Sequence, residues 1–556
     1  MSGGEATASS GVDLETLEFT LESIGEFARR ELPDSLLIEL DERDEFPEAL
    51  VRRMCGEELG IQLLFVPEEY GGMGGNAFDI YRVCERMGTI DLGLATSVLA
   101  TFLGSDPISV GGTPEQKQQF MGRIAEDGIL MAYGATEPDA GSDLASLKTT
   151  AVPVADNGDV VGYRLSGAKQ WISNGGVAEV STVLALAPGG PSWFVVESGT
   201  EGFTHGEHED KHGIRLSNTA ALFLDDVYVD ADRLIGAVEG QGLVQAQQVF
   251  GYTRLMVAAF GLGAGWAALD LAIPYSKERI QAGGPLSEKQ GYTHKLIIPH
   301  VVALEAARAA IEETATRIDA GEGVLNIEGA VSKYLATEAG DAAADAAIQA
   351  LGGYGYTHEY MVEKIKRDVR ITRIYEGTSE IMEMTISRGR WQEHLKTRGD
   401  HYHAAGRELE ALETTDPGLG AGTAALAHHA LAEVLEGCRA ARLTRHQHIL
   451  LRLGQLEARV EGAAALVRRA AAAAHGELDQ KADRRLAPDA VAVASRINAR
   501  DVAHAVATEG VRWIAGAEGG DLSSLEDRLA LPAIRRAQQG LIADLDQLAD
   551  RVYGRV

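Results

Sequence analysis

The chain has 556 residues, of which 45% are hydrophobic, and a formal net charge of −31 at pH 7. This length predicts several domains rather than one compact core. Because phosphate contacts need clustered Lys and Arg, the acidic balance argues against a nucleic-acid binder and against broad attraction to an anionic membrane. The three cysteines, Cys55, Cys84 and Cys438, are far apart in the sequence, which predicts neither a disulfide framework nor a cysteine zinc site and favours a reducing compartment.

The first residues, MSGGEATASSGVDLE, contain no basic region and no apolar stretch, so no signal peptide is expected. Residues 1–13 are small and polar and are expected to be disordered. The longest apolar run, Leu255 to Leu269, is too short for a membrane span. These features predict a cytoplasmic protein.

Residues 14–127 have a helical pattern, as in LEFTLESIGEFARREL, where apolar residues recur three and four apart. Thr113, Pro114 and Gln116 predict a helix start with a capping box and proline at the first helical position. Over residues 128–237 the period changes to two, and DVVGYRLSGAKQWISN, EVSTVLALA, SWFVVES and AALFLDDVYV predict strands. The turn signals DNGD and PGGP between them favour an antiparallel barrel or sandwich over a βαβ sheet.

Residues 238–395 return to helical patterns. The stretch RLMVAAFGLGAGWAALDLAI is apolar on every side, which is typical of a helix inside a bundle. The segment LETTDPGLGAG predicts a linker over residues 396–425, and the Ala-, Leu- and Arg-rich residues 426–556 predict an additional helical domain. The expected fold class is therefore mainly α with a β middle domain.

Two stretches around the predicted strands could contact a planar ligand. In YGATEPDAGSD, Pro138, Gly141 and Ser142 predict a tight loop with free backbone N–H groups and hydroxyls, although the same residues also form ordinary turns. In KQWISN, Trp171 could cover one face of a flavin, or it could be a core tryptophan. Composition alone does not decide either case.

A glycine-rich stretch, ALGGYGY, lacks the third glycine and the preceding strand of a dinucleotide-binding fingerprint, so a Rossmann fold is rejected. Gly352 and Gly353 could still let a pyrophosphate approach the backbone. In RIYEGTSEI, Glu376 is either an acid near a helix start, with Thr378 or Ser379 as N-cap, or a base that takes a proton from carbon.

The histidines do not predict a metal site. His401 and His403 are two residues apart, and His428 and His429 are adjacent. Neither spacing places two rings on one helix face. Metal binding is therefore not expected.

Seven segments occur together in order: YGATEPDAGSD, KQWISNGG, KHGIRLSNT, YTRLMVAA, SKERIQAGGPLSEKQ, IQALGGYGYTHEY and RIYEGTSEI. Together they resemble the acyl-CoA dehydrogenase family over residues of about 15–395. The resemblance implies a helical N-domain, an antiparallel β-barrel and a four-helix bundle. It also implies FAD as cofactor and conversion of a medium- to long-chain acyl-CoA to the trans-2-enoyl-CoA.

The resemblance assigns roles to individual residues. Glu376 corresponds to the base that takes the Cα proton while a hydride passes from Cβ to the flavin N5; burial under the substrate would raise the pKa of Glu376. The implied FAD contacts are Tyr133, Thr136, Ser142, Trp171, Ser173, Arg279, Gln281, Gln349, Gly352, Gly353 and Thr378. The implied substrate contacts are Ser142, Arg254, Tyr375 and Gly377. In this family the group from Arg279 to Gly353 binds the pyrophosphate and adenosine of a neighbouring subunit's FAD.

The sequence departs from the family pattern in places. Ala282 stands where phenylalanine is usual, Gly251 where many members have aspartate, and Met361 where proline is usual. Some members carry the base just before the arginine of the substrate-side helix, but here that residue is Thr253, which is no base at neutral pH. The stretch IDLGLATSVLATFL has no positive charge, so an apolar acyl pocket is expected.

Residues 396–556 resemble the C-terminal domain of very-long-chain members, in which extra helices replace a second pair of subunits and help the enzyme reach a membrane. Plain additional bundle surface is the alternative. Arg468, Arg469, Arg484 and Arg485 offer basic spots for peripheral membrane contact. The expected partners are acyl-CoA, an electron-transfer flavoprotein and further copies of the chain, as a homodimer or homotetramer.

Other interpretations remain open. An acyl-CoA oxidase would use the same fold, and a short- or branched-chain acyl-CoA dehydrogenase would use the same chemistry. A flavin-containing DNA-binding relative is opposed by the charge of −31. A non-catalytic flavin-binding scaffold is opposed by the presence of Glu376 beside the FAD motifs.

Overall fold

The computed structural model describes residues 11–518 and 522–555, which form two compact units. Unit 1 contains the residues up to Met256 with Thr316–Asn326 and Arg367–Ile371. Unit 2 contains Val257–Ala315, Ile327–Lys366 and the residues from Thr372 onward. The long helix α8 (Gly242–Glu278) contributes residues to both units.

Unit 1 begins with a helical region, as the sequence predicts. Its helices are α1 (Leu14–Glu31), α2 (Asp34–Arg43), α3 (Glu48–Cys55), α4 (Ile61–Phe65), α5 (Ala77–Ile90), α6 (Leu92–Gly111) and α7 (Pro114–Asp127). The capping box at the start of α7 is confirmed, because Thr113 and Gln116 each accept a hydrogen bond from the other's backbone N–H. Such reciprocal bonds satisfy N–H groups that the helix leaves without partners.

Disorder was expected for residues 1–13, of which residues 1–10 lie outside the described residues. The remaining three are ordered. The backbone N–H of Val12 donates to the Asp79 carboxylate at 2.9 Å, and the side chain of Asp13 caps α1 by accepting from Thr16 N–H. These contacts hold the start of the helical region in place.

The middle of unit 1 is a seven-stranded sheet in the order β1-β4-β2-β3-β7-β6, with β5 paired to β4. The strands are β1 (Met131–Gly134), β2 (Thr150–Asp156), β3 (Asp159–Ser173), β4 (Val180–Ala187), β5 (Gly190–Glu197), β6 (Phe203–His205) and β7 (Thr219–Asp230). The four predicted strand segments are confirmed as β3, β4, β5 and β7. Most pairs are antiparallel, but β1 and β2 both pair with β4 in parallel.

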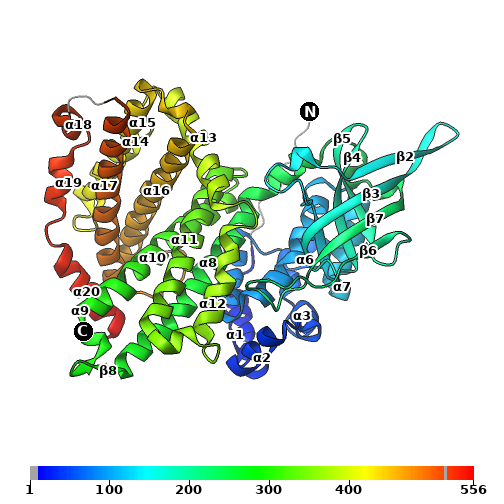
Figure 1. The fold of residues 1–556 in the computed structure, drawn as a ribbon, viewed down its shortest axis with the longest axis horizontal. Coiled ribbons are helices and arrows are strands. Elements are labelled where there is room, and N and C mark those ends of the chain that lie inside the picture. The colour runs from blue at the N-terminus through cyan, green and yellow to red at the C-terminus, as the bar shows by residue number, and fades with distance from the viewer. Residues whose placement is uncertain (1–10, 519–521, 556) are drawn as a thin grey trace. The chain divides into compact units, whose positions relative to one another are not determined.

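One face of the sheet forms the core of the β region. Tyr163 and Leu165 of β3 and Phe194 and Val196 of β5 are buried in the same hydrophobic cluster. Their spacing of two follows from the alternation of side chains along a strand. Helix α6 packs against β1 and joins the helical region to the sheet (Figure 1).

Unit 2 is helical apart from a small hairpin. Besides the second half of α8, its elements are β8 (Ile280–Gln281), β9 (Gly284–Pro285), α9 (Gln290–Tyr292), α10 (Ile298–Asp319), α11 (Asn326–Leu351), α12 (Met361–Val369), α13 (Ser379–Lys396), α14 (His401–Thr415), α15 (Ala421–Ala440), α16 (Gln447–His475), α17 (Pro488–Glu518), α18 (Leu522–Arg528), α19 (Leu531–Ala537) and α20 (Leu541–Tyr553). The last residues of α10 and α12 and the first residue of α11 belong to unit 1. Helix α8 is long and apolar enough to cross a membrane, but 78% of its most apolar window is buried inside the protein. That burial fits the predicted core helix.

The predicted linker over residues 396–425 is largely helical. Helix α14 occupies its centre, and the turn at residues 416–420 is the break before α15. The buried side chain of Leu409 packs with Ala421, Ala424 and Ala425, so this segment carries part of a core. Helices α14 to α17 lie alongside one another and continue the helical body (Figure 1).

The four arginines expected to offer basic surface spots are engaged within unit 2. Arg468 and Arg469 pair with carboxylates of α10, and Arg485 pairs with a carboxylate of α8 while its guanidinium lies 4.4 Å from the Trp266 ring centroid. Arg484 donates to backbone carbonyls. Their charges are compensated by the protein, so they give little support to membrane contact.

Candidate active site

Glu376 lies in a strained turn just before α13. Its backbone φ is +51°, in a region that non-glycine residues rarely occupy, and Gly377 follows with φ +94°. A side chain at position 377 would be strained because of this positive φ, so glycine is favoured there. Of the two predicted caps, Thr378 is the N-cap of α13 and accepts from Ile381 N–H at 3.3 Å. Glu376 therefore precedes the cap, and a strained backbone of this kind is typical of functional sites.

A buried lysine holds this turn from the adjacent helix. Lys333 of α11 is fully buried, and its ammonium donates to the carbonyl of Tyr375 at 3.0 Å and to the carbonyl of Gly377. These two carbonyls flank Glu376. Charge-assisted hydrogen bonds are about twice as strong as neutral ones, so Lys333 is well suited to fix the backbone position of Glu376.

The ends of the turn are attached to the same helix. Arg373 donates to the carboxylates of Glu338 at 2.7 Å and Asp341 at 2.9 Å. The Ser379 hydroxyl donates to Glu338 at 2.6 Å. Since both ends and the centre are bonded to α11, the turn is held as a rigid element of unit 2.

The predicted flavin contacts of unit 1 lie around the end of β3. The backbone N–H of Gln170 donates to the Thr136 carbonyl at 3.0 Å and brings the YGATEPDAGSD loop beside the KQWISN strand. The pairing of β3 with β7 shifts register between Lys169 and Ile172, and Trp171 has φ +57° at that shift. Its side chain is 62% exposed, so the core-tryptophan interpretation is wrong. An exposed indole is free to cover a planar ligand.

Buried contacts fix the end of β3 and the strand β1 that carries Tyr133. Ser173 ends β3, and the next residue, Asn174, is fully buried and donates from its side chain to the Ser97 carbonyl at 2.8 Å. The ring of Tyr133 lies 4.6 Å from that of Trp193. The strand ends that carry the predicted flavin contacts are therefore fixed by packing.

The YGATEPDAGSD loop has a rigid base and an open tip. At the base the buried carboxylate of Glu137 accepts from Lys169 at 2.7 Å and from the backbone N–H groups of Lys148 and Thr149 at 2.6 and 3.0 Å. Burial alone would raise the pKa of Glu137, but these donors outweigh it and lower the pKa to about 2. At the tip, Ser142 is exposed. The turn interpretation is confirmed and is compatible with ligand contact.

The predicted pyrophosphate and adenosine contacts gather in unit 2. Arg279 and Gln281 are exposed on the β8–β9 hairpin, whose turn residue Ala282 has φ +49°. Exposed Gly352 and Gly353 follow α11, and a Cβ built on either meets nothing within 4 Å. Their backbone is thus open to close approach by a ligand. The small side chain of Ala282 forms the turn where the family usually has phenylalanine.

A tyrosine connects these two segments. The hydroxyl of Tyr292 donates to the Ala350 carbonyl at 3.2 Å, beside the exposed Gln349. By contrast, Lys333 and Gln349 are about 24 Å apart along α11 at 1.5 Å per residue. Within one chain, therefore, the group around Arg279 lies far from Glu376.

Arg254 is buried in unit 1, where its guanidinium donates to the Asn326 carbonyl at 3.0 Å and to the Asn326 side chain. A Cβ built on Gly251 would lie 1.7 Å from the Val324 carbonyl oxygen. This close backbone approach explains the glycine at a position where many family members have aspartate. Thr253 is 2% exposed.

The described residues fit FAD in three respects. Trp171 offers an exposed planar surface for the ring, Gly352 and Gly353 offer open backbone for the pyrophosphate, and Arg279 offers an exposed cation for a phosphate. These are the surfaces that a dinucleotide with one aromatic end and two phosphates requires.

Sequence reasoning missed the residues that support the site, chiefly Lys333, Glu338 and Asn326. A signal existed for one of them. In the largely apolar helical stretch GAVSKYLA, Lys333 occurs on a face that is otherwise apolar. A charged residue in such a position is buried only when it has partners.

Comparison with known proteins decides the family. The profiles for the acyl-CoA dehydrogenase N-terminal, middle and C-terminal domains match residues 15–127, 132–227 and 240–390. The chain belongs to the acyl-CoA dehydrogenase family. It is therefore an FAD-dependent oxidoreductase that acts on acyl-CoA. The comparison confirms the expected family, cofactor and fold.

Three similar proteins of the family differ in how much of this acyl-CoA dehydrogenase they match. An acyl-CoA dehydrogenase of Bacillus subtilis (strain 168) is 38% identical over 379 residues, which are 66% of this chain and 95% of that protein. The structure of butyryl-CoA dehydrogenase from Megasphaera elsdenii is 34% identical, covers 68% of this chain and 98% of its own, and has a TM-score of 0.64. An acyl-CoA dehydrogenase from Bacillus anthracis, complexed with FAD, is 24% identical, covers 99% and 98% of the two chains, and has a TM-score of 0.82. The fold of the extension is therefore found in that third protein too.

Proposed function

We propose that this acyl-CoA dehydrogenase converts a medium- to long-chain acyl-CoA thioester to its trans-2-enoyl-CoA, with Glu376 as the base. The observation that carries the proposal is the strained backbone of Glu376, with φ +51°, between two carbonyls bonded to the buried Lys333. A structure maintains such a strained residue only when its surroundings fix it. A general base must be held in this way, because proton transfer depends on its geometry before its pKa.

In the proposed reaction, the carboxylate of Glu376 takes the proton from Cα, and the backbone N–H of Glu376 donates to the thioester oxygen. Preorganised donors of this kind typically contribute about 10²–10³-fold in rate. FAD, when bound, supplies the acceptor for the hydride that leaves Cβ. Trp171 would cover the flavin ring, and an electron-transfer flavoprotein would serve as the electron acceptor.

The cofactor site is proposed to need two copies of the chain. Gln349, Gly352 and Gly353 lie at the end of α11 far from Lys333, which holds the Glu376 turn, and Tyr292 ties the segment after the Arg279 hairpin to that same end. They would therefore serve the FAD of a neighbouring subunit. Exposed apolar side chains surround this group in unit 2: Ile280 is 58% exposed, Tyr354 47%, Tyr356 82% and Tyr360 38%. Such side chains are more typical of a subunit contact than of free surface, and they support at least a homodimer.

The chain length of the substrate separates two candidates. The stretch from Ile90 to Leu103 has no cationic side chain, which supports an apolar pocket for a long acyl chain. The likeness to a butyryl-CoA dehydrogenase supports a short-chain substrate instead.

A substrate panel tests the proposal. The purified yellow protein is mixed without oxygen with acyl-CoA of 4 to 20 carbons, straight and branched, and the loss of flavin absorbance is followed. The proposal predicts the fastest bleaching with medium to long straight chains. Fastest bleaching with the four-carbon substrate would replace it by the short-chain alternative. Repeating the assay in air detects peroxide and thus an oxidase.

A further inference from the structure

The β8–β9 hairpin carries Arg279 and Gln281 but has little packing of its own. Each strand has two residues, and the residues from Arg279 to Gly283 are all exposed. A two-stranded hairpin is marginally stable alone in water. Its position must therefore be set by contacts at its base.

One such contact comes from the C-terminal helix α20, which belongs to the same unit. Ser276, at the end of α8 and fully buried, lies 3.0 Å from the hydroxyl of Tyr553. The Ser276 hydroxyl already donates to the Ile273 carbonyl at 2.7 Å, so Tyr553 is the donor in this pair. The bond ties the last turn of α8 to the end of α20.

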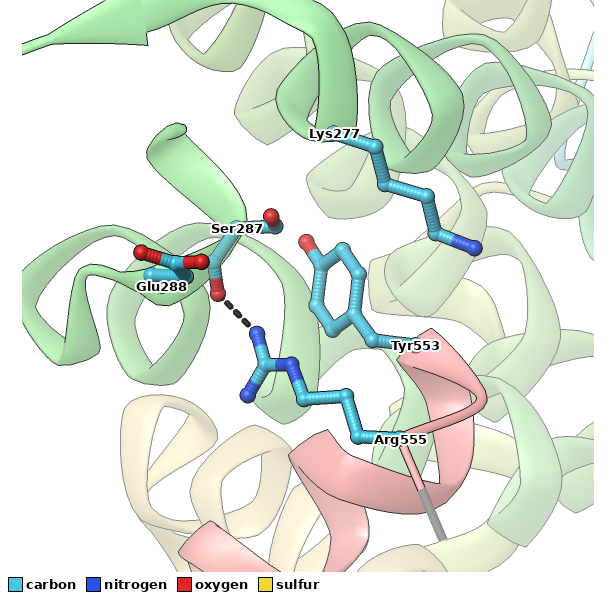
Figure 2. A pocket seen from close by; sticks show the side chains of 5 residues that line it. All are labelled: Lys277, Ser287, Glu288, Tyr553 and Arg555. Atoms are coloured by element: carbon cyan, nitrogen blue, oxygen red, sulfur yellow. Dashed lines mark hydrogen bonds between the residues drawn. The ribbon is translucent and has the colours of Figure 1, made fainter. Parts of the chain in front are cut away.

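Further contacts follow the hairpin on its other side. Arg555 donates to the carbonyl of Ser287, and the carboxylate of Asp546 accepts from the side chain of Gln290 at 2.6 Å and lies 3.0 Å from the ring of His294. Figure 2 shows Tyr553 and Arg555 directed toward Ser287 from one helix end. Together with Lys277 and Glu288 these residues line an open pocket of about 410 Å³.

The contacts reach the second group of predicted FAD residues as well. Tyr292 lies between Gln290 and His294, and its hydroxyl donates to the Ala350 carbonyl just before Gly352. A displacement of the segment from Ser276 to His294 would therefore be transmitted to the end of α11. The hairpin with Arg279 and Gln281 and the turn at Gly352 and Gly353 therefore both depend on the position of the segment from Ser276 to His294.

We propose that α20 positions the hairpin and the Gly352–Gly353 turn for FAD, so that the C-terminal extension is a working part of the cofactor site. Tyr553, Asp546 and Arg555 are positioning residues in this scheme. The inference rests on the proposed function in one respect, namely that Arg279 and Gln281 contact FAD. It gives the extension a role that bundle surface alone would not have.

The test compares full-length variants of these residues. Asp546→Ala, Tyr553→Phe and Arg555→Ala are made singly and together. Asp546→Glu tests whether another carboxylate can replace the acceptor. Asp527→Ala, which removes an exposed acid of α18, is the matched control. FAD affinity is measured by flavin fluorescence, and hydrogen exchange of residues 276–294 is measured with excess FAD. Each single variant should weaken FAD binding by roughly two- to tenfold, which corresponds to one lost hydrogen bond.

The combined variant should bind FAD more weakly than any single one and should exchange faster over residues 276–294, with the thermal midpoint close to that of the control. Asp546→Glu should restore affinity. Unchanged affinity would overturn the inference, whether or not exchange becomes faster, and so would weaker binding without faster exchange. Failure of the unaltered chain to bind FAD would instead refute the proposed function, and the exchange measurement would still show whether α20 holds the hairpin.

Discussion

Replacing Lys333 tests the proposed support of Glu376 most specifically. Lys333→Met keeps the length and most of the volume of the side chain but removes the ammonium that donates to the carbonyls of Tyr375 and Gly377. Both carbonyls lose a charge-assisted donor. The turn that presents Glu376 then loses these two hydrogen bonds at its centre and keeps those that Arg373 and Ser379 make at its ends.

The magnitude follows from these two bonds. A hydrogen bond to a charged group contributes about 1.5–3 kcal/mol, but removing a buried ammonium also removes its desolvation cost. We therefore expect the free energy that holds the turn in its conformation to fall by about 2–4 kcal/mol. If that loss appears in the proton-transfer step, flavin reduction slows by roughly 30- to 1,000-fold.

The assay is single-turnover flavin reduction by acyl-CoA in a stopped-flow instrument without oxygen. Thr337→Val is the matched control, because Thr337 is fully buried one turn further along α11 and its hydroxyl donates within that helix, to the Lys333 carbonyl at 2.8 Å. The control should reduce flavin at close to the normal rate. A normal rate in Lys333→Met would refute the argument that Lys333 positions the base.

Two further predictions concern unit 1. The folded pKa of Glu137 is about 2, below its ordinary value of 4.5, so its stabilisation is complete above about pH 4.5 and is lost as pH falls toward 2. Glu137→Gln should therefore lower the urea midpoint at pH 6 and make it less dependent on pH between 5 and 3; an unchanged pH profile would contradict the role of the Lys169 contact. Gly251→Asp, which restores the family's usual residue, should destabilise the fold by about 1–3 kcal/mol or more, because its Cβ would meet the Val324 carbonyl oxygen at 1.7 Å. An unfolding midpoint equal to that of the unaltered chain would contradict that close approach.

Local patterns in the sequence predicted much of the fold. The period of two in DVVGYRLSGAKQWISN gave β3, and the capping box at Thr113 gave the start of α7, because both depend on neighbours in sequence. The helix within the predicted linker shows the opposite case, because its burial depends on residues far along the chain. The breakers in LETTDPGLGAG end α14 at Thr415, yet Leu409 before them is buried in a core that only the folded extension provides.

The candidate site residues could be predicted where they lie in a sequence motif. The contacts that position them could not be predicted, because they come from distant segments of the chain. Glu376 was predicted as the base because RIYEGTSEI occurs in order with six other segments of the family, but its positive φ and the bonds from Lys333 depend on a helix about forty residues earlier in the chain. For Trp171 the sequence left a core and a surface position open, because the strand alternation is interrupted at Trp171 by a register shift near the end of β3, where its φ is +57°. Such shifts leave no clear mark in composition.

The central claim is that Glu376 takes the Cα proton, and one measurement tests it directly. Glu376→Gln is compared with Glu380→Gln, an exposed acid in the first turn of α13, for flavin content and for anaerobic bleaching by the best acyl-CoA of the panel. We expect both variants to keep FAD and Glu380→Gln to bleach at close to the normal rate. In Glu376→Gln the rate of flavin bleaching should fall by about 10²–10⁴-fold. Bleaching of Glu376→Gln at the rate of the unaltered enzyme would contradict the assignment of the base.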